Sequence, residues 1–449
     1  MRRYVRKPSG ILNDELYLKL MILFAGILYW VYGFMPLMDK LFNVLALLAL
    51  FFLARILLSS RVMTGSIAVM IFIVGSGMCT IALNSFSTVS LIALCYMLIS
   101  AGFLTYCSGR KSSEDLTDNL WKIARIILLG GTAVLAVSFL LYRAGVTVDY
   151  SYSAITGTTL HLGRSRDTNA LVGILGNANI TSDFCVIYIA MVLFAWRRNR
   201  HRKALCLLML LLGFLVLFFT YSRGGYLGAL VVLFVFILTD YIGRLKHDGA
   251  RVWLYLGFLA EVLLAIAIVY FLLFRDPSSS LSDSLSHFTG RTSREMSGST
   301  DTRLQLWSTG LKVLTDNPVN FLFGVGATIR THIAVYAPVT LKESLFNNVH
   351  NIYIQTAVAY GVIGLLLMLT AIMVLLIKPA RRMFRDLDRY QDLAPVLGLI
   401  CGILVINLFE SDFYMKKPFE SSCFWIMLGL FSGLVRKREE ESAWPEAQK

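Results

Sequence analysis

The feature that most constrains this chain is a series of long apolar runs. A run such as LFNVLALLALFFLARILL at 41–58 approaches the roughly 20 residues that a helix needs to cross a ~30 Å hydrocarbon core. Backbone groups in lipid must hydrogen-bond within their own segment, and these runs lack the alternation of membrane-barrel strands. With 57% hydrophobic residues and a mean hydropathy of +0.67, the chain is predicted to be an all-α polytopic membrane protein.

The runs predict about twelve transmembrane helices. They lie at 17–36, 41–58, 64–84, 88–107, 120–142, 171–195, 204–220, 225–242, 252–274, 352–377, 394–411 and 418–435. We see no internal repeat of the kind that many transporter folds contain.

The basic residues gather in short loops beside these runs. If the basic N-terminus, read as an uncleaved anchor, is cytoplasmic, alternation puts the loops 108–119, 196–203, 243–251 and 378–393 and the C-terminus on the cytoplasmic side. These loops are the basic ones, as the positive-inside rule requires. The net charge of +14 therefore indicates membrane topology and not a nucleic-acid partner.

The same alternation predicts one functional domain with a long extracytoplasmic loop. We expect helices one to nine in 1–274, the loop in 275–351, helices ten to twelve in 352–435 and a cytoplasmic tail in 436–449. The loop begins with a Ser-rich stretch at 276–300, which is too polar to order itself.

A short amphipathic helix follows in the loop. Leu304, Trp307, Leu311 and Leu314 recur at helical spacing, with Asp301 or Thr302 as N-cap and Asn317-Pro318 as the end. We expect this helix to lie on the outer membrane surface.

Arg223, in the short turn TYSRGG between two apolar runs, is the first candidate for chemistry. Gly224 and Gly225 allow a tight turn and leave amide groups at the start of the next helix, which favours an anion site. The alternative is an arginine that snorkels to lipid head groups.

Arg303 and His350 are the second and third candidates. Arg303 falls in the first turn of the predicted loop helix, where a cation is unfavourable unless it shares an anion with the helix N-terminus. His350 precedes the tenth span at its outer end, where a neutral imidazole can take a proton from a hydroxyl. The alternatives are a solvated arginine and a structural histidine.

Weaker candidates lie near the same membrane face. Arg166 and Asn179 flank the start of the sixth span, and Glu410 and Asp412 follow the eleventh, where they could orient His350 or bind an acceptor. Glu261, in the middle of the ninth span, needs a partner that the sequence does not identify. The cysteines are single, and no metal-ligand spacing or nucleotide fingerprint is present, so we predict no metal and no cofactor.

Four segments resemble, in order and spacing, the conserved blocks of the O-antigen ligase and polysaccharide polymerase family. They are GILGNAN, YSRGGYLG, DTRLQLWSTGLKVLTDNPVNFLFGVG and HNIYIQTAVAYGVIGL, and the resemblance covers residues 170–365. The chain departs from the family in having GNAN where a proline is common, and in the Ser-rich insertion before Arg303.

The resemblance implies a GT-C-like fold and an inverting glycosyltransferase in the bacterial inner membrane, working in lipopolysaccharide or capsule biosynthesis. It implies a glycan donor linked to undecaprenyl diphosphate, a sugar hydroxyl as acceptor, and an active site on the extracytoplasmic face without metal. The diphosphate-binding arginines would be Arg223 and Arg303, and the residue activating the acceptor would be His350. Both ligase and polymerase activity remain open, and the alternative function is a transporter or flippase for an anionic lipid or solute.

Overall fold

The computed structural model describes residues 113–153, 158–166, 169–198, 202–247, 293–326, 329–338, 349–410 and 418–443. The predicted spans at 17–36, 41–58, 64–84, 88–107 and 252–274 lie outside the described residues, as do Glu261 and Asp412.

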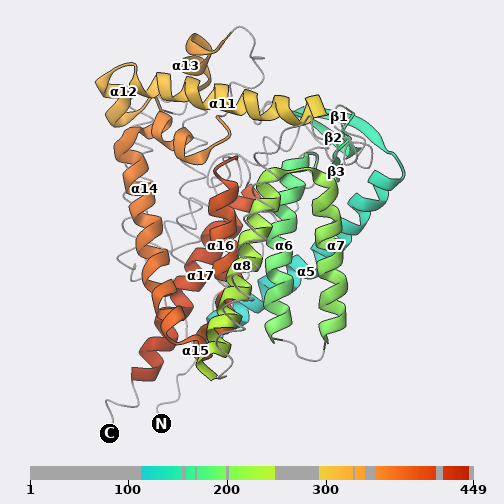
Figure 1. The fold of residues 1–449 in the computed structure, drawn as a ribbon, viewed down its shortest axis with the longest axis vertical. Helices are drawn as coiled ribbons and strands as arrows, with labels where there is room; N and C mark the ends of the chain where they lie inside the picture. The colour runs from blue at the N-terminus through green and yellow to red at the C-terminus, as the bar shows by residue number, and fades with distance from the viewer. Residues whose placement is uncertain are drawn as a thin grey trace, which may run out of the picture.

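Most of the described residues are helical. Figure 1 shows upright helices with α11 lying across one end of the bundle. The helices are α5 (Ser113–Arg143), α6 (Ala178–Arg198), α7 (Lys203–Thr220), α8 (Arg223–His247), α11 (Ser293–Thr315), α12 (Pro318–Phe323), α13 (Ile329–Tyr336), α14 (Ile352–Arg385), α15 (Leu387–Tyr390), the 3-10 turn η3 (Gln391–Leu393), α16 (Ala394–Ile406) and α17 (Pro418–Ala443).

Six helical segments among the described residues are long and apolar enough to cross a membrane, which confirms a polytopic membrane protein. They are α5, α6, α7, α8 up to Gly243, α14, and the segment Leu387–Ile406 that includes α15 and α16. α17 covers the predicted span at 418–435 and continues to Ala443, but it is not among the six. The count of twelve and the GT-C-like architecture stay predictions.

The all-α prediction is wrong for the connection between α5 and α6. A three-stranded antiparallel sheet forms there, in the order β1 (Thr147–Ser153), β2 (Thr158–Arg164) and β3 (Leu171–Gly173). The predicted span at 171–195 accordingly starts later, because β3 occupies its first residues and α6 begins at Ala178. The Thr, Tyr and Val content of TVDYSYS favours strand over helix.

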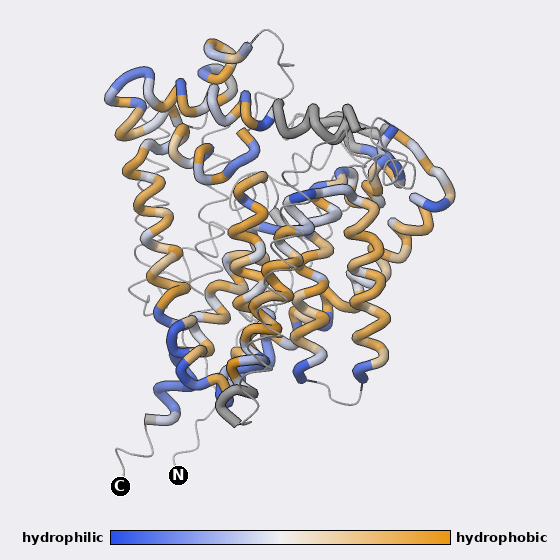
Figure 2. The backbone as a smooth tube through the Cα atoms, viewed as in Figure 1, coloured by the Kyte–Doolittle hydropathy of each residue, from blue (hydrophilic) through white to orange (hydrophobic). Residues whose placement is uncertain are grey.

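The two ends of the bundle differ in chemistry. At one end, called the basic end below, ion pairs join Arg197 of α6 to Asp240 of α8 at 2.8 Å and Arg438 of α17 to Asp392 at 2.7 Å. Figure 2 shows apolar helix middles that give way to hydrophilic residues at this end. The described parts of the predicted cytoplasmic loops all lie here, and the starts of α6, α8 and α14 lie at the opposite end. The described helices therefore alternate in direction, and which end of the bundle faces the cytoplasm stays a prediction.

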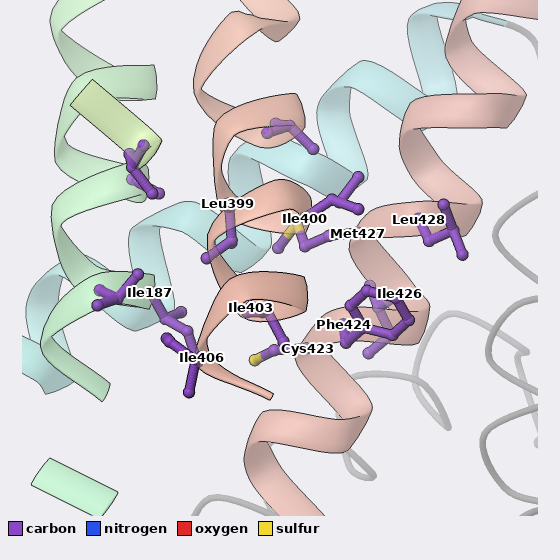
Figure 3. Packing of buried hydrophobic residues seen from close by; sticks show 14 of the residues in the cluster. Ile187, Leu399, Ile400, Ile403, Ile406, Cys423, Phe424, Ile426, Met427 and Leu428 are labelled. Carbon is purple, nitrogen blue, oxygen red and sulfur yellow. The ribbon is translucent and has the colours of Figure 1, made fainter. Parts of the chain in front are cut away.

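α16 packs against α8, α6 and α17. Its glycines bring it against α8: a Cβ on Gly402 would lie 2.8 Å from the carbonyl oxygen of Gly228, and a Cβ on Gly398 would lie 3.0 Å from that of Val232. Small residues let membrane helices approach this closely. On its other sides, side chains of α16 pack between Ile187 of α6 and the apolar residues of α17 (Figure 3).

The loop helix is longer than predicted, and its predicted apolar face is only partly buried in the protein. α11 begins at Ser293, so neither Asp301 nor Thr302 is its N-cap, and the end of the Ser-rich stretch is helical. The buried apolar residues are Leu306, Val313 and Leu314, whereas Leu304 and Leu311 are exposed. The predicted end is confirmed, since α11 stops at Thr315 and Asn317 caps α12 by accepting a hydrogen bond from the amide of Asn320 at 2.8 Å.

A backbone joint fixes the loop to α14. Gly361 interrupts α14 with φ 69° and ψ −179°, and Gly324 has a similar conformation that is essentially restricted to glycine. The carbonyls of Val358 and Ala359, freed by this kink, accept hydrogen bonds from the amides of Val325 at 2.8 Å and Gly326 at 2.9 Å. The segment after α12 is thus held rigidly against the first third of α14.

The joint predicts that Gly361→Ala is strongly destabilising. A Cβ at this position would lie 2.0 Å from the carbonyl oxygen of Leu322, and the backbone conformation would be strained in addition. We expect a loss of about 3 kcal/mol or more, measured by thermal unfolding of the purified protein in detergent. The matched control is Gly130→Ala in α5, where a Cβ meets nothing within 4 Å and a gain of about 0.5–1 kcal/mol is expected. Equal unfolding temperatures for Gly361→Ala and the wild type would mean that the backbone contact at Gly361 does not stabilise the protein.

Candidate functional site

The polar site is organised around the carboxylate of Glu410, which is 7% exposed. Its Oε1 accepts hydrogen bonds from Nη2 of Arg303 at 3.0 Å and from Nδ2 of Asn179 at 2.6 Å. Its Oε2 faces Nδ1 of His350 at 3.5 Å. One buried carboxylate therefore joins side chains from α6, α11 and the residue before the cap of α14.

Glu410 is positioned by the way in which α16 ends against the start of α14. The amide of Ile352 donates to the carbonyl of Asn407 at 3.0 Å, and the side chain of Asn351 donates to the carbonyl of Leu408 at 3.0 Å. The hydroxyl of Tyr353 donates to the carbonyl of Leu404 at 2.8 Å. These bonds satisfy carbonyls at a helix terminus that would otherwise lack partners. They also hold the Glu410 backbone beside His350.

The backbone of His350 is fixed by its neighbour Asn351. Asn351 is the N-cap of α14, and its side chain accepts from the amides of Tyr353 at 3.0 Å and Ile354 at 3.1 Å. His350 itself has φ 51°, in the left-handed region that is uncommon for residues other than glycine. One edge of the ring faces Glu410. The side chain is 28% exposed, so the ring remains partly accessible.

Arg303 is held by Glu410 and by the anchored loop. Because α11 starts at Ser293, Arg303 lies well inside the helix, and the predicted first-turn position is wrong. The charge of Arg303 is compensated by the ion pair with Glu410, and its side chain keeps 24% exposure. One turn further along α11, Trp307 packs against Phe409, with 6.4 Å between ring centroids, next to the Glu410 backbone.

Arg223 opens α8 close to the same turn. The connection from α7 is shorter than the six-residue turn predicted, since only Tyr221 and Ser222 separate the two helices. A Cβ on Gly224 would lie 3.7 Å from Cβ of Phe409, so the first turn of α8 adjoins the residue before Glu410. Arg223 is half-buried there.

Gly225 has a packing role in the same turn. A Cβ on Gly225 would lie 2.6 Å from Cβ of Ser182, so its absence lets α8 approach α6. The amide of Gly225 donates to Oγ of Ser222 at 3.4 Å, which is a weak N-cap bond. A role of this amide in binding an anion stays a prediction.

The remaining candidates have different outcomes. Asn179 lies in the first turn of α6, and Asn177 precedes that helix and accepts from the Asn179 amide at 2.8 Å. Arg166 is exposed beyond the end of β2, and its part in the site stays a prediction. Within the described residues, no group of three or more His, Cys, Asp or Glu side chains is placed to hold a metal ion.

The sequence did not indicate two features of the site. The convergence of Asn179 and Arg303 on one oxygen of Glu410 joins residues that are up to 231 positions apart, which no local pattern encodes. The backbone joint was also missed, although its signal was present in the glycines of FGVG and AYGV.

These features define a polytopic membrane protein with a polar, partly buried site where several helices end. Residues 207–369 match the family model described as O-antigen ligase, so this part of the chain is similar to that family. The predicted resemblance is confirmed. No match to the chain is found among curated proteins. The matched segment contains Arg223, Arg303 and His350, whereas Asn179 and Glu410 come from outside it.

The geometry predicts that Glu410→Gln loosens the attachment of α11. The substitution keeps the side-chain shape but removes the charge that compensates Arg303, and we expect a loss of about 1–3 kcal/mol. Thermal unfolding together with hydrogen exchange over residues 302–315 measures both effects. Glu440→Gln is the control: its carboxylate is 51% exposed at the basic end, and its removal should change stability by less than about 0.5 kcal/mol. We call Glu410 and its partners Arg303, Asn179 and His350 the Glu410 cluster. If hydrogen exchange in α11 were the same in Glu410→Gln and in the wild type, the cluster would not be what holds α11 in place.

Proposed function

We propose that the protein is an inverting glycosyltransferase of the O-antigen ligase and polymerase type. In this proposal it moves a glycan from undecaprenyl diphosphate to a sugar hydroxyl at the extracytoplasmic face of the bacterial inner membrane, with both termini cytoplasmic. The observation that carries the proposal is the meeting of Arg303 and His350 on Glu410, beside the first turn of α8 that holds Arg223. The family match over residues 207–369 supports it.

The arginines would act on the leaving group. Breaking the bond between the anomeric carbon and the phosphate oxygen leaves negative charge on the lipid diphosphate. Guanidinium groups fixed in a site of low dielectric stabilise such charge without reorganising, and their planar forks match phosphate oxygens. Arg303 enters this role already oriented by Glu410, and Arg223 lies at a helix N-terminus, where an anion is also favoured by the helix dipole. In this proposal the two arginines balance the negative charge on the departing diphosphate, without a metal ion.

His350 would act on the acceptor. With Nδ1 facing the Glu410 carboxylate, Nε2 is the ring nitrogen that meets the acceptor hydroxyl. As the hydroxyl oxygen bonds to the anomeric carbon, its proton passes to Nε2, and the diphosphate departs from the opposite face. A carboxylate at Nδ1 orients the imidazole and is the counter-ion of the imidazolium that forms. One displacement gives inversion of configuration.

The transporter alternative explains fewer of the observations. Charged residues inside a membrane domain can mark a solute path near the bilayer midplane. Here His350 and Glu410 lie where α14 starts and α16 ends, beside Arg303 of α11, which suits a reaction at a membrane surface better than a central path. Ligase and polymerase activity use the same donor chemistry, so the acceptor decides between them.

The proposal predicts loss of transfer when the cluster is broken. In proteoliposomes supplied with undecaprenyl-diphosphate oligosaccharide, His350→Ala should lower the turnover rate about 10²–10⁴-fold, and Arg223→Ala or Arg303→Ala about 10²–10³-fold. The measurement is the glycan product ladder, which also separates polymerase from ligase. Arg303→Lys should lose most of the activity as well, because the bidentate fork is lost.

Matched controls separate chemistry from folding. Arg143→Ala removes an exposed arginine in the last turn of α5, and His332→Ala removes a histidine of α13; neither change should alter transfer. A wild type that is inert with a range of donors and acceptors but moves lipid across the bilayer would overturn the proposal in favour of the transporter. Full activity of His350→Ala would remove this residue from the reaction.

A further inference from the structure

A groove lies at the basic end of the bundle, far from the Glu410 cluster. It has a volume of about 860 Å³ and runs between the last turns of α14, α15 and the end of α17. His350 stands just before the first residue of α14, and the groove lies along its last turns. At 1.5 Å per residue, the part of α14 after its kink at Gly361 alone separates the two sites by about 25–35 Å.

The floor of the groove is strongly cationic. Its basic side chains are Lys378, Arg381, Arg382, Arg385 and Arg389. Its two acidic side chains are Asp386 and Glu439, and Arg382 forms an ion pair with Glu439. Five cations against two carboxylates leave an excess of three positive charges.

The basic side chains share one face of α14. Lys378, Arg381 and Arg385 follow at intervals of three and four residues, so they stand above one another along the helix. All three are exposed. Guanidinium groups in this arrangement can bind two oxygens of one phosphate.

An apolar wall continues the cationic face toward the middle of the helix. Met373 and Val374 are 51% and 53% exposed, and Ile377 completes the wall one turn before Arg381. α14 is one of the helices long and apolar enough to span the membrane, so this wall faces the depth of the acyl chains and the cations face the depth of the head groups. A soluble anion would use the cations and leave the apolar wall empty.

We propose that this groove binds an anionic phospholipid. The lipid phosphate is held by Arg381 and Arg385, with Lys378 and Arg389 beside it, and the first acyl segment lies along Met373, Val374 and Ile377. Basic pockets between membrane helices on the cytoplasmic side suit anionic head groups. The site does not depend on the glycosyltransferase reaction, because its residues are separate from the Glu410 cluster.

The test is lipid binding by native mass spectrometry. The purified full-length chain is titrated with phosphatidylglycerol and, separately, with phosphatidylcholine, and bound lipid is counted. The wild type should retain phosphatidylglycerol preferentially, and the double variant Arg381→Gln/Arg385→Gln should lose about tenfold or more in affinity for it. Both side chains are exposed, so the variant should unfold at the wild-type temperature.

The control removes two charges from the same end outside the groove. Arg198 ends α6 and Arg202 precedes α7, and both are exposed. Arg198→Gln/Arg202→Gln should keep wild-type binding. An equal loss in this control would mean attraction to surface charge in general and would overturn the site. Equal binding of both lipids, or unchanged affinity in Arg381→Gln/Arg385→Gln, would overturn it as well.

Discussion

The structure of the site depends on compensation of one buried negative charge. Removing a carboxylate from water costs several kcal/mol unless charged and hydrogen-bonding partners surround it. Glu410 meets this requirement with Arg303 and Asn179 on one oxygen and with His350 facing the other. The need to satisfy Glu410 therefore draws α6, α11 and the start of α14 together. The interaction that stabilises this end of the bundle also arranges the groups that we propose for catalysis.

The second constraint is mechanical. α11 lies across the bundle, and Arg303 can hold a ligand in a fixed position only if α11 does not move relative to the other helices. The joint between Gly324 and Gly361 supplies this rigidity through backbone contacts that no side chain could enter. Gly228, Gly398 and Gly402 similarly allow α8 and α16 to pack closely. Glu410 lies in the turn that follows α16. Sites held by closely packed helices are more precise than sites held by loops alone.

Much of this could be predicted from the sequence, for identifiable reasons. Hydropathy and loop charge predicted the alternating helices, because lipid leaves few structural choices. The strand at Thr147–Ser153 was missed because it contains no long apolar run. The position of α11 on the membrane surface stays a prediction, with Leu304 and Leu311 exposed and Leu314 buried. Arg223, Arg303 and His350 were named from local motifs and the family resemblance. The role of Glu410 as their common partner required the tertiary structure, because its partners come from distant helices.

The central claim is that the Glu410 cluster and the start of α8 form the binding site of a lipid diphosphate. The most direct test is a cryo-electron microscopy structure of the wild-type chain with undecaprenyl-diphosphate oligosaccharide in a nanodisc. We expect density for the diphosphate between Arg223 and Arg303, with the anomeric carbon near Nε2 of His350. Density for the diphosphate at the basic end of the bundle, or away from both arginines, would contradict it.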